Sequence, residues 1–132
     1  MAGYSGTPLP RKLGVKAGST LALIDEPPGT MGDLPPDVLV RRAARGHADV
    51  VVAFFTRRVD FERRVEGLGR MVFPDGGLWI AWPKRASGLV TTMTDGVVRD
   101  VALPLGLVDN KVCAIDDTWT GLRLVWRLEH RS

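Results

Sequence analysis

Side chains that can bind a small anion follow an apolar stretch in the middle of the sequence. Residues 78–82 are apolar and end at Trp82, and Lys84, Arg85 and Ser87 come directly after them. Lysine and arginine form charge-assisted hydrogen bonds to anions, and exposed amides of a loop with small residues add further donors. Trp82 offers a stacking face for a base. A solvent-facing loop that keeps an apolar strand soluble has the same composition, so both interpretations stay open.

Two pairs of acidic residues are candidates for a second kind of chemistry. Asp25 and Glu26 follow an early apolar stretch, and Asp116 and Asp117 stand just before Trp119. Paired carboxylates can bind a metal, exchange protons with a substrate or accept hydrogen bonds from a ribose. No histidine stands near either pair in the sequence. Helix caps and turn hydrogen bonds are the more ordinary use of such acids.

The sequence does not indicate a nucleophile. Cys113 alternates with apolar neighbours, as a small core residue in a strand does. Ser87 lacks the Gly-x-Ser-x-Gly turn of the hydrolases and a histidine partner. Enzymatic activity is therefore left open, no catalytic residue is assigned, and the cofactor, if any, is unknown.

Length and composition indicate a single domain of 132 residues, with residues 1–6 as a loose arm. The lone cysteine excludes an internal disulfide, and no leader with a charged and then an apolar part is visible, so we expect a cytoplasmic protein. The apolar runs fall short of the roughly 20 residues that cross a bilayer, so no membrane partner is expected. The 18 basic residues barely exceed the 15 acidic ones, and most of the arginines fit a salt-bridged helix face, which makes nucleic acid an unlikely partner.

Hydrophobic periodicity predicts strands and helices in alternation. Strands are expected at residues 19–25, 49–55, 78–82, 111–116 and 122–128, with a weak edge strand at 38–42 and a short helical turn at 7–14. A helix capped by Thr56 carries an apolar stripe of Phe61, Val65, Leu68 and Val72 and the ion pairs Arg58–Glu62, Asp60–Arg64 and Glu66–Arg70. Thr94 and Asp95 open a second helix, which Pro104 shortens and Gly106 ends.

This order of elements predicts a three-layer Rossmann-like α/β sandwich. Its sheet is mostly parallel, and a C-terminal hairpin, with a connection at residues 117–121, adds an antiparallel strand at the edge. Ligands of such sheets bind at the carboxyl ends of the parallel strands. We therefore expect one ligand-binding rim made of Asp25, Glu26, Thr56, Arg57, Trp82, Lys84, Arg85, Ser87, Asp116, Asp117 and Trp119.

Three segments carry a resemblance to a known family. Residues 3–15 (GYSGTPLPRKLGV), 82–88 (WPKRASG) and 111–127 (KVCAIDDTWTGLRLVWR) resemble an actinobacterial family of small proteins known only as domain-of-unknown-function family 3052. The similarity runs from Gly3 to Arg127, nearly the whole chain. This resemblance implies no activity.

A more distant likeness concerns the order of elements. From Asp49 onward, this order is similar to the C-terminal half of the Rossmann-like methyltransferases that use S-adenosylmethionine, and residues 15–29 (VKAGSTLALIDEPPG) look like their first strand and its loop. That family has a Gly-x-Gly turn after the strand, whereas this sequence has Asp-Glu-Pro-Pro-Gly. Two prolines remove amide donors. The resemblance thus implies a lost or altered cofactor site.

Three hypotheses of function follow. The first is a non-enzymatic binding or regulatory module for a small anionic or nucleotide-like ligand, or for a protein partner, at the rim marked by Trp82, Lys84 and Arg85. The second is a minimal or degenerate methyltransferase-like enzyme in which Asp25 or Glu26 contacts the cofactor. The third is a structural subunit that forms a homodimer through its edge hairpin, with an apolar patch around Trp119 and Trp126.

Overall fold

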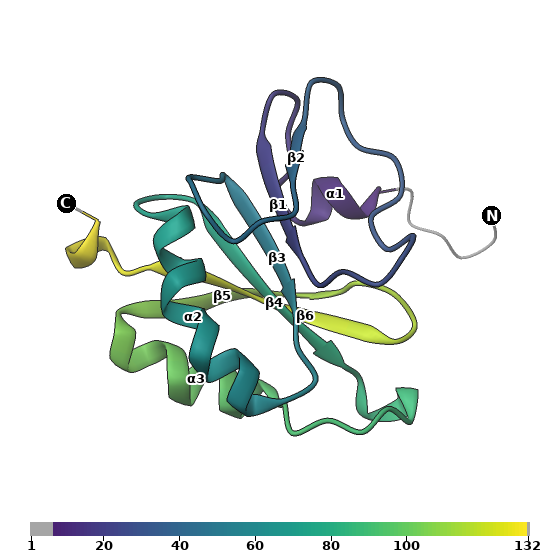
Figure 1. Cartoon of the computed structure of the whole chain (residues 1–132), viewed down its shortest axis with the longest axis vertical. Helices are drawn as coiled ribbons and strands as arrows, with labels where there is room; N and C mark the ends of the chain where they lie inside the picture. Colours follow the sequence, from purple (N-terminus) through teal and green to yellow (C-terminus); the bar gives the residue numbers. More distant parts are fainter. Residues whose placement is uncertain (1–6, 132) are drawn as a thin grey trace.

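A computed structural model describes residues 7–131, so the arm predicted for residues 1–6 lies outside the described part. Within that part, six strands form one sheet in the order β2-β1-β3-β4-β6-β5 (Figure 1). The strands are β1 (Thr20–Ile24), β2 (Leu39–Arg41), β3 (Val50–Phe54), β4 (Gly77–Pro83), β5 (Leu107–Ala114) and β6 (Trp119–Trp126). The strands β2, β1, β3 and β4 are parallel to one another, and β6 runs antiparallel to both β4 and β5. The predicted Rossmann-like sandwich is confirmed.

The strands at the centre of the sheet are apolar because both of their faces are covered. Every residue of β3 and of β4 is buried. Alternate side chains of β1 enter different clusters, with Ala22 and Ile24 on one face and Leu21 and Leu23 on the other. The apolar runs therefore predicted these strands to within two residues at each end, and the weak strand expected at 38–42 is β2, at one edge.

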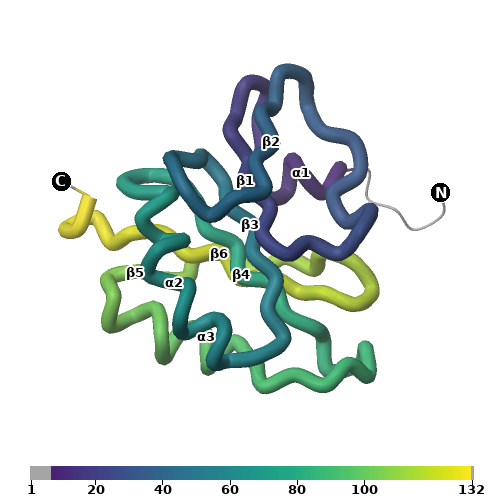
Figure 2. Tube along the Cα trace, in the orientation of Figure 1, coloured from purple at the N-terminus to yellow at the C-terminus, as the bar shows by residue number. Residues whose placement is uncertain are grey.

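The two faces of the sheet carry layers of unequal thickness. On one face lie α2 (Arg58–Val72) and α3 (Asp95–Ala102), and the predicted stripe of α2 is fully buried there. The other face is covered by the single turn of α1 (Leu9–Lys12) and by the segment between β1 and β2 (Figure 2). That segment adds Met31 to the buried cluster on this face. The second layer therefore contains no long helix among the described residues. No helix in either layer of the described part is long and apolar enough to span a bilayer.

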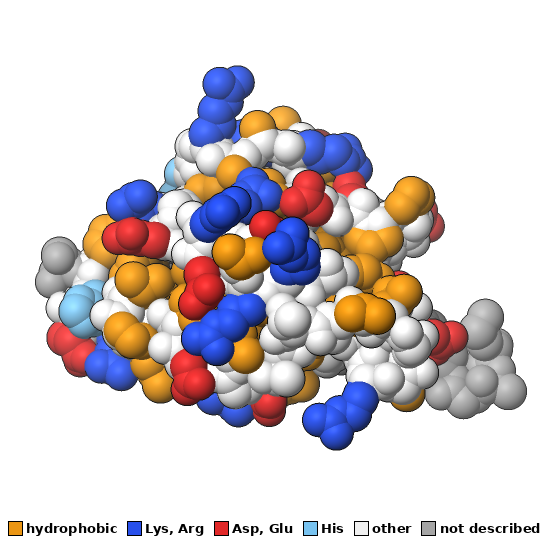
Figure 3. Space-filling model, turned by 60° about the horizontal axis from the view of Figure 1, so that its bottom comes forward, with side chains coloured by type: hydrophobic (Ala, Val, Ile, Leu, Met, Phe, Trp, Pro, Cys, Tyr) orange, Lys and Arg blue, Asp and Glu red, His pale blue; other side chains and the backbone are white. Residues whose placement is uncertain are grey.

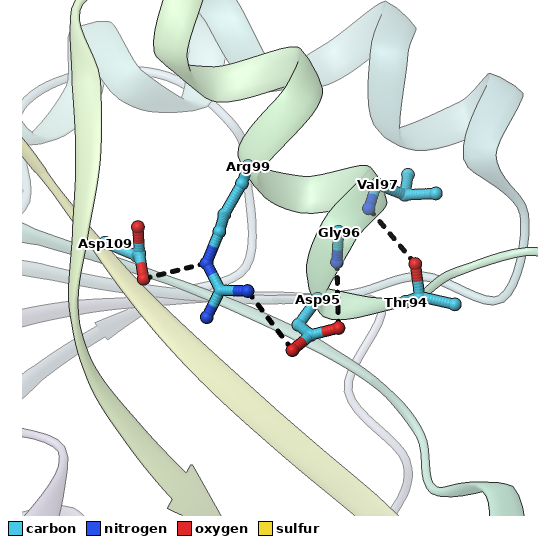
Figure 4. Close-up of polar contacts among 6 residues, drawn as sticks. All are labelled: Thr94, Asp95, Gly96, Val97, Arg99 and Asp109. Carbon is cyan, nitrogen blue, oxygen red and sulfur yellow. Dashed lines mark hydrogen bonds and ion pairs between the residues drawn. The ribbon is translucent and has the colours of Figure 1, made fainter.

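The caps of the two long helices come from different places. Thr94 caps α3 as predicted, its Oγ1 accepting from the Val97 amide at 3.1 Å (Figure 4). The helix then ends in a short 3₁₀ turn, Leu103–Leu105, followed by Gly106 with a φ of +97°. The prediction that Thr56 caps α2 is wrong. The Arg58 amide donates instead to Thr92 Oγ1 at 2.7 Å, so the cap comes from the loop after β4.

The predicted boundaries of the C-terminal hairpin are also wrong. The strand β5 begins directly after Gly106, and the connection is residues 115–118 rather than 117–121. The antiparallel strand β6 lies inside the sheet, and β5 forms the edge. Gly121 lies within β6. A glycine is needed there because a Cβ would lie 3.2 Å from the side chains of Trp79 and Ile115. A small residue thus indicates close packing here and not a turn. The remaining short helices are η1 (Arg85–Ser87) and η3 (Leu128–His130).

Candidate functional site

The order of the strands defines a switch point between β1 and β3. The chain runs from β1 outward to β2 and then crosses to β3 on the other side, so a crevice opens at the carboxyl ends of β1 and β3. A cavity of about 450 Å³ lies there. It is lined by Asp25, Phe54, Phe55, Thr56, Asp60, Arg63, Arg64 and Trp119. The fold thus brings Asp25, Thr56 and Trp119 together, as the sequence predicted.

Asp25 lines this crevice directly after β1. It follows β1 with a φ of +58°, a left-handed conformation that asparagine and aspartate adopt more readily than most side chains. Its Oδ2 lies 3.1 Å from Arg64 Nη1, so the ion pair predicted between Asp60 and Arg64 is wrong. Both partners are substantially exposed, and ion pairs of this kind contribute only about 0–1 kcal/mol to stability. A ligand can therefore displace the pair at little cost.

A second cavity, of about 460 Å³, opens on the other side of Asp25. It is lined by Leu23, Asp25, Glu26, Pro28, Gly29 and Arg42. Glu26 Oε1 lies 2.6 Å from Arg42 Nε, so the first acid of the turn pairs with α2 and the second with the residue that follows β2. Pro27 and Pro28 offer no amide donors to either cavity.

An aromatic pair forms one wall of the crevice. Trp119, the first residue of β6, meets Phe54 of β3 edge to face, with ring centroids 5.2 Å apart and an interplanar angle of 84°. Trp119 is only partly buried, so part of its ring can contact a ligand. The wall exists because β6 begins level with the end of β4, where Trp119 pairs with Pro83.

The end of β4 and the loop that follows it line a different cavity. Trp82 and Arg85 belong to a hollow of about 630 Å³. Its other lining residues are Pro83, Leu89, Val90, Thr91, Met93, Thr94, Asp95, Val112, Thr120 and Leu122. Trp82 is a buried wall residue, with 8% of its surface exposed. The single rim expected from the sequence is therefore divided into separate hollows.

Five of the predicted residues line none of these three cavities: Arg57, Lys84, Ser87, Asp116 and Asp117. Ser87 Oγ accepts from the Leu89 amide at 3.2 Å. Asp116 Oδ1 accepts from the amides of Thr118 and Trp119, at 2.9 and 2.8 Å. These are the turn hydrogen bonds that formed the more ordinary interpretation of Asp116.

Arg99 forms an ion pair with Asp95, the acid at the start of α3. Its Nη1 lies 3.2 Å from Asp95 Oδ2 and its Nε lies 3.1 Å from Asp109 Oδ2 on β5 (Figure 4). The hydrogen bond and charge of Asp109, and then those of Asp95, hold the pKa of Arg99 above its usual value. Asp95 is therefore already paired at the margin of the 630 Å³ cavity.

Charges of both signs share the surface. On the face seen in Figure 3, basic and acidic side chains alternate, with small apolar areas between them. Among residues 7–131, no three histidine, cysteine, aspartate or glutamate side chains are grouped so that they could hold a metal ion. Because its charges alternate, the described part of the face seen in Figure 3 carries no continuous basic stripe of the kind that binds a nucleic-acid backbone.

Sequence reasoning missed three arginines of the two cavities beside Asp25: Arg63 and Arg64 in the crevice and Arg42 in the second cavity. Arg42 had a usable signal, because it follows β2 and so belongs to the carboxyl edge of the sheet. Arg63 and Arg64 had none, since a solvated helix face explains them equally well.

Comparison with solved structures identifies the fold. A methyltransferase from Aquifex aeolicus that depends on S-adenosylmethionine superposes with a TM-score of 0.59 at 14% identity, over 86% of this chain and 85% of that one. Magnesium protoporphyrin IX methyltransferase from Synechocystis PCC 6803, with bound S-adenosylmethionine, gives 0.58 at 8% identity, over 90% and 74%. The fibrillarin pre-rRNA processing protein of Methanococcus jannaschii gives 0.56 at 11% identity, over 85% and 68%.

The chain has the fold of the Rossmann-like methyltransferases. The likeness that the order of elements implied is thereby confirmed for the fold alone. No family model and no curated protein matches the chain. The resemblance to the uncharacterised actinobacterial family therefore stays a prediction.

Proposed function

We propose that this protein is a non-catalytic binding module that takes a small anionic or nucleotide-like ligand at the switch point between β1 and β3. The observation that supports it is the 450 Å³ cavity in which two arginines, two acids and an indole meet at the carboxyl ends of these strands. Open α/β sheets bind their ligands at this position. The proposal moves the site from the loop after β4, which the sequence favoured, to the crevice beside Asp25.

Each side chain of the crevice suits one part of such a ligand. Arg63 and Arg64 can donate charge-assisted hydrogen bonds to a phosphate or carboxylate. Asp25 can accept hydrogen bonds from ribose hydroxyls, and the exposed part of Trp119 can contact a base. Because the Asp25–Arg64 pair is solvent-exposed, a ligand that offers both an anion and hydroxyl donors replaces it with stronger contacts.

The loop after β1 does not fit S-adenosylmethionine as the glycine turn of the family does. The two prolines cannot donate to a ligand, and Asp25 and Glu26 are each engaged by an arginine. We therefore derive no methyl-transfer step for this chain.

A minimal methyltransferase-like enzyme is the second candidate, and the fold comparisons favour it. It requires that S-adenosylmethionine bind and be converted to S-adenosylhomocysteine. The third hypothesis, a subunit with an apolar patch around Trp119 and Trp126, has less support. Trp119 packs on Phe54, whereas Trp126 packs on Phe73 and joins the cluster on the opposite face of the sheet.

A thermal-shift screen of the full chain tests the proposal. The panel holds S-adenosylmethionine, S-adenosylhomocysteine, nucleoside mono-, di- and triphosphates and simple phosphates. A ligand at 100 times its dissociation constant stabilises the fold by about 2.7 kcal/mol, which raises the melting temperature by several degrees. We expect a nucleotide to give this shift and Arg64→Gln to abolish it. Arg70→Gln, on the same helix but outside the cavity, is the matched control.

Two outcomes would contradict the proposal. One is a panel without any shift, or a shift that Arg64→Gln and Asp25→Asn leave unchanged. The other is turnover: if mass spectrometry detects S-adenosylhomocysteine formed by the pure protein with a methyl acceptor, the enzyme hypothesis replaces the binding module.

A further inference from the structure

Four cationic side chains converge at the end of the sheet opposite the switch point. A cavity of about 260 Å³ is lined by Arg11, Lys12, Leu13, Gly14, Asn110, Lys111 and Arg123. The lining contains no carboxylate among the described residues. The cavity lies beside the start of β4, because Arg123 of β6 pairs in register with Trp79. We call this hollow the basic pocket.

Arg123 is the unusual member of the basic pocket. Its side chain is partly buried and lies over the backbone of Gly77, where an added Cβ would be 2.5 Å from the guanidinium Nε. The ion pairs of residues 7–131 involve Arg42, Arg58, Arg64, Arg70 and Arg99, and none of them includes Arg123. Within the same residues its guanidinium donates no hydrogen bond to a protein acceptor.

An unpaired, partly buried guanidinium is costly. Burial, and then the charge of Arg131, lowers the pKa of Arg123, which means that its surroundings disfavour the charged form. A guanidinium nevertheless stays charged at neutral pH. An anion bound beside it would relieve both effects, since charged groups away from bulk water are normally paired.

The neighbouring cations are held in place by the fold. Lys111 pairs with Arg123 across β5 and β6, so both side chains project from the same face of the sheet. Lys111 Nζ donates to the Lys12 carbonyl at 2.9 Å and so ties β5 to the end of α1. Cations in the last turn of a helix have an ordinary explanation in the helix dipole, which accounts for Arg11 and Lys12. It does not account for Lys111 and Arg123, which lie on strands.

We propose that the basic pocket is a second, separate binding site, for a phosphate group carried by a small molecule. Lysine and arginine donors from α1, β5 and β6 surround one compact volume, which suits a tetrahedral oxyanion with several acceptors. The volume is below the roughly 300–1,000 Å³ of pockets that enclose drug-sized ligands, so the pocket takes the phosphate or pyrophosphate and leaves the remainder of the molecule outside. A nucleic-acid backbone would need a longer basic stripe than this hollow provides.

Titration calorimetry of the full chain in a buffer free of phosphate tests the proposal, with inorganic phosphate and pyrophosphate as probes. We expect pyrophosphate to bind, and we expect Arg123→Gln to raise its dissociation constant at least about tenfold. Gly77→Ala should weaken it in the same direction, because the added methyl displaces the guanidinium while leaving its charge in the protein. Circular dichroism checks that both variants are folded, and Arg70→Gln serves as the control for net charge.

The two proposed sites can be distinguished by their variants. Binding in the basic pocket must survive Arg64→Gln, whereas loss of pyrophosphate binding in that variant alone assigns the anion to the switch point and overturns this proposal. Equal binding by wild type and Arg123→Gln also overturns it. So does an oligonucleotide that binds more tightly than pyrophosphate at the same ionic strength, because the partner would then be nucleic acid.

Discussion

Trp79 joins the sheet to the thin layer that contains α1. It is the largest fully buried side chain, and its indole Nε1 donates to the Leu13 carbonyl at 2.9 Å. The acceptor belongs to the end of α1, 66 residues earlier in the chain. The thin layer on this face is therefore fixed to the centre of the sheet by a buried hydrogen bond.

We expect Trp79→Phe to destabilise the protein by about 2 kcal/mol or more, because it leaves the buried Leu13 carbonyl unpaired and opens a small cavity. Trp126→Phe is the matched control. Its indole also donates to a carbonyl, that of Gly69 at 2.9 Å, but the site is only partly buried and water can replace the donor. That variant should lose less than about 1 kcal/mol. Urea unfolding followed by circular dichroism gives both values, and equal losses would contradict this account.

For single residues, the sequence predicted the positions that follow from strand order and missed those that depend on side-chain direction. Asp25 and Thr56 could be assigned to the crevice because each follows a recognisable strand. Arg64 had two possible acidic partners, Asp60 four residues earlier and Asp25 far away in sequence. Helical spacing favoured Asp60, whereas the structure pairs Arg64 with Asp25. Arg123 gave no signal, since its exposure and its lack of a partner depend on the register of β6 with β4.

The helix α2 contains two glycines that differ in their surroundings. A Cβ added at Gly67 would meet nothing within 4 Å, whereas one at Gly69 would lie 3.1 Å from Leu107 and 3.3 Å from Trp126. We expect Gly67→Ala to stabilise the protein by about 0.5–1 kcal/mol, because alanine has the higher helix propensity. Gly69→Ala should destabilise it, because its close packing on β5 and β6 would be lost. Thermal unfolding of the two variants checks this, and a stabilised Gly69→Ala would refute the packing argument.

The cap of α2 makes this helix dependent on a distant loop. Thr92 accepts from the Arg58 amide, and its own amide donates to the Thr56 carbonyl at 3.0 Å. We expect Thr92→Ala to cost about 1 kcal/mol, as does the loss of an ordinary N-cap. Thr118→Ala is a suitable control, since among the described residues only the backbone of Thr118 is hydrogen-bonded. Denaturant titration measures both variants, and amide exchange at the start of α2 should increase only in Thr92→Ala.

The elements themselves could be predicted where their pattern was simple. The parallel strands are continuous apolar runs, and α2 has a regular stripe, so both were found. The hairpin was misplaced because only Leu107 and Cys113 of β5 are buried, and because the strand contains an irregularity between Asp109 and Lys111. The cap by Thr92 could not be predicted, because nothing in the sequence relates that threonine to Arg58.

The two edges of the sheet determine how whole molecules meet. The strand β2 has only 3 residues, and β5 combines its irregularity with the exposed Lys111. Short, irregular and charged edges discourage pairing between sheets. We therefore expect a monomer in solution, with a radius of gyration of about 14 Å by X-ray scattering. A particle of twice the monomer mass, independent of concentration, would instead restore the hypothesis of a subunit that pairs through its hairpin.

The position of β6 has a consequence for synthesis of the protein on the ribosome. This strand is the last of the described chain, yet it lies between β4 and β5 and supplies hydrogen bonds to both. Until it leaves the exit tunnel, the apolar edge of β4 stays open and β5 has no neighbour to join. The nascent chain thus carries an incomplete sheet with an open apolar edge until residues 119–126 have emerged, and such an edge favours aggregation in that interval.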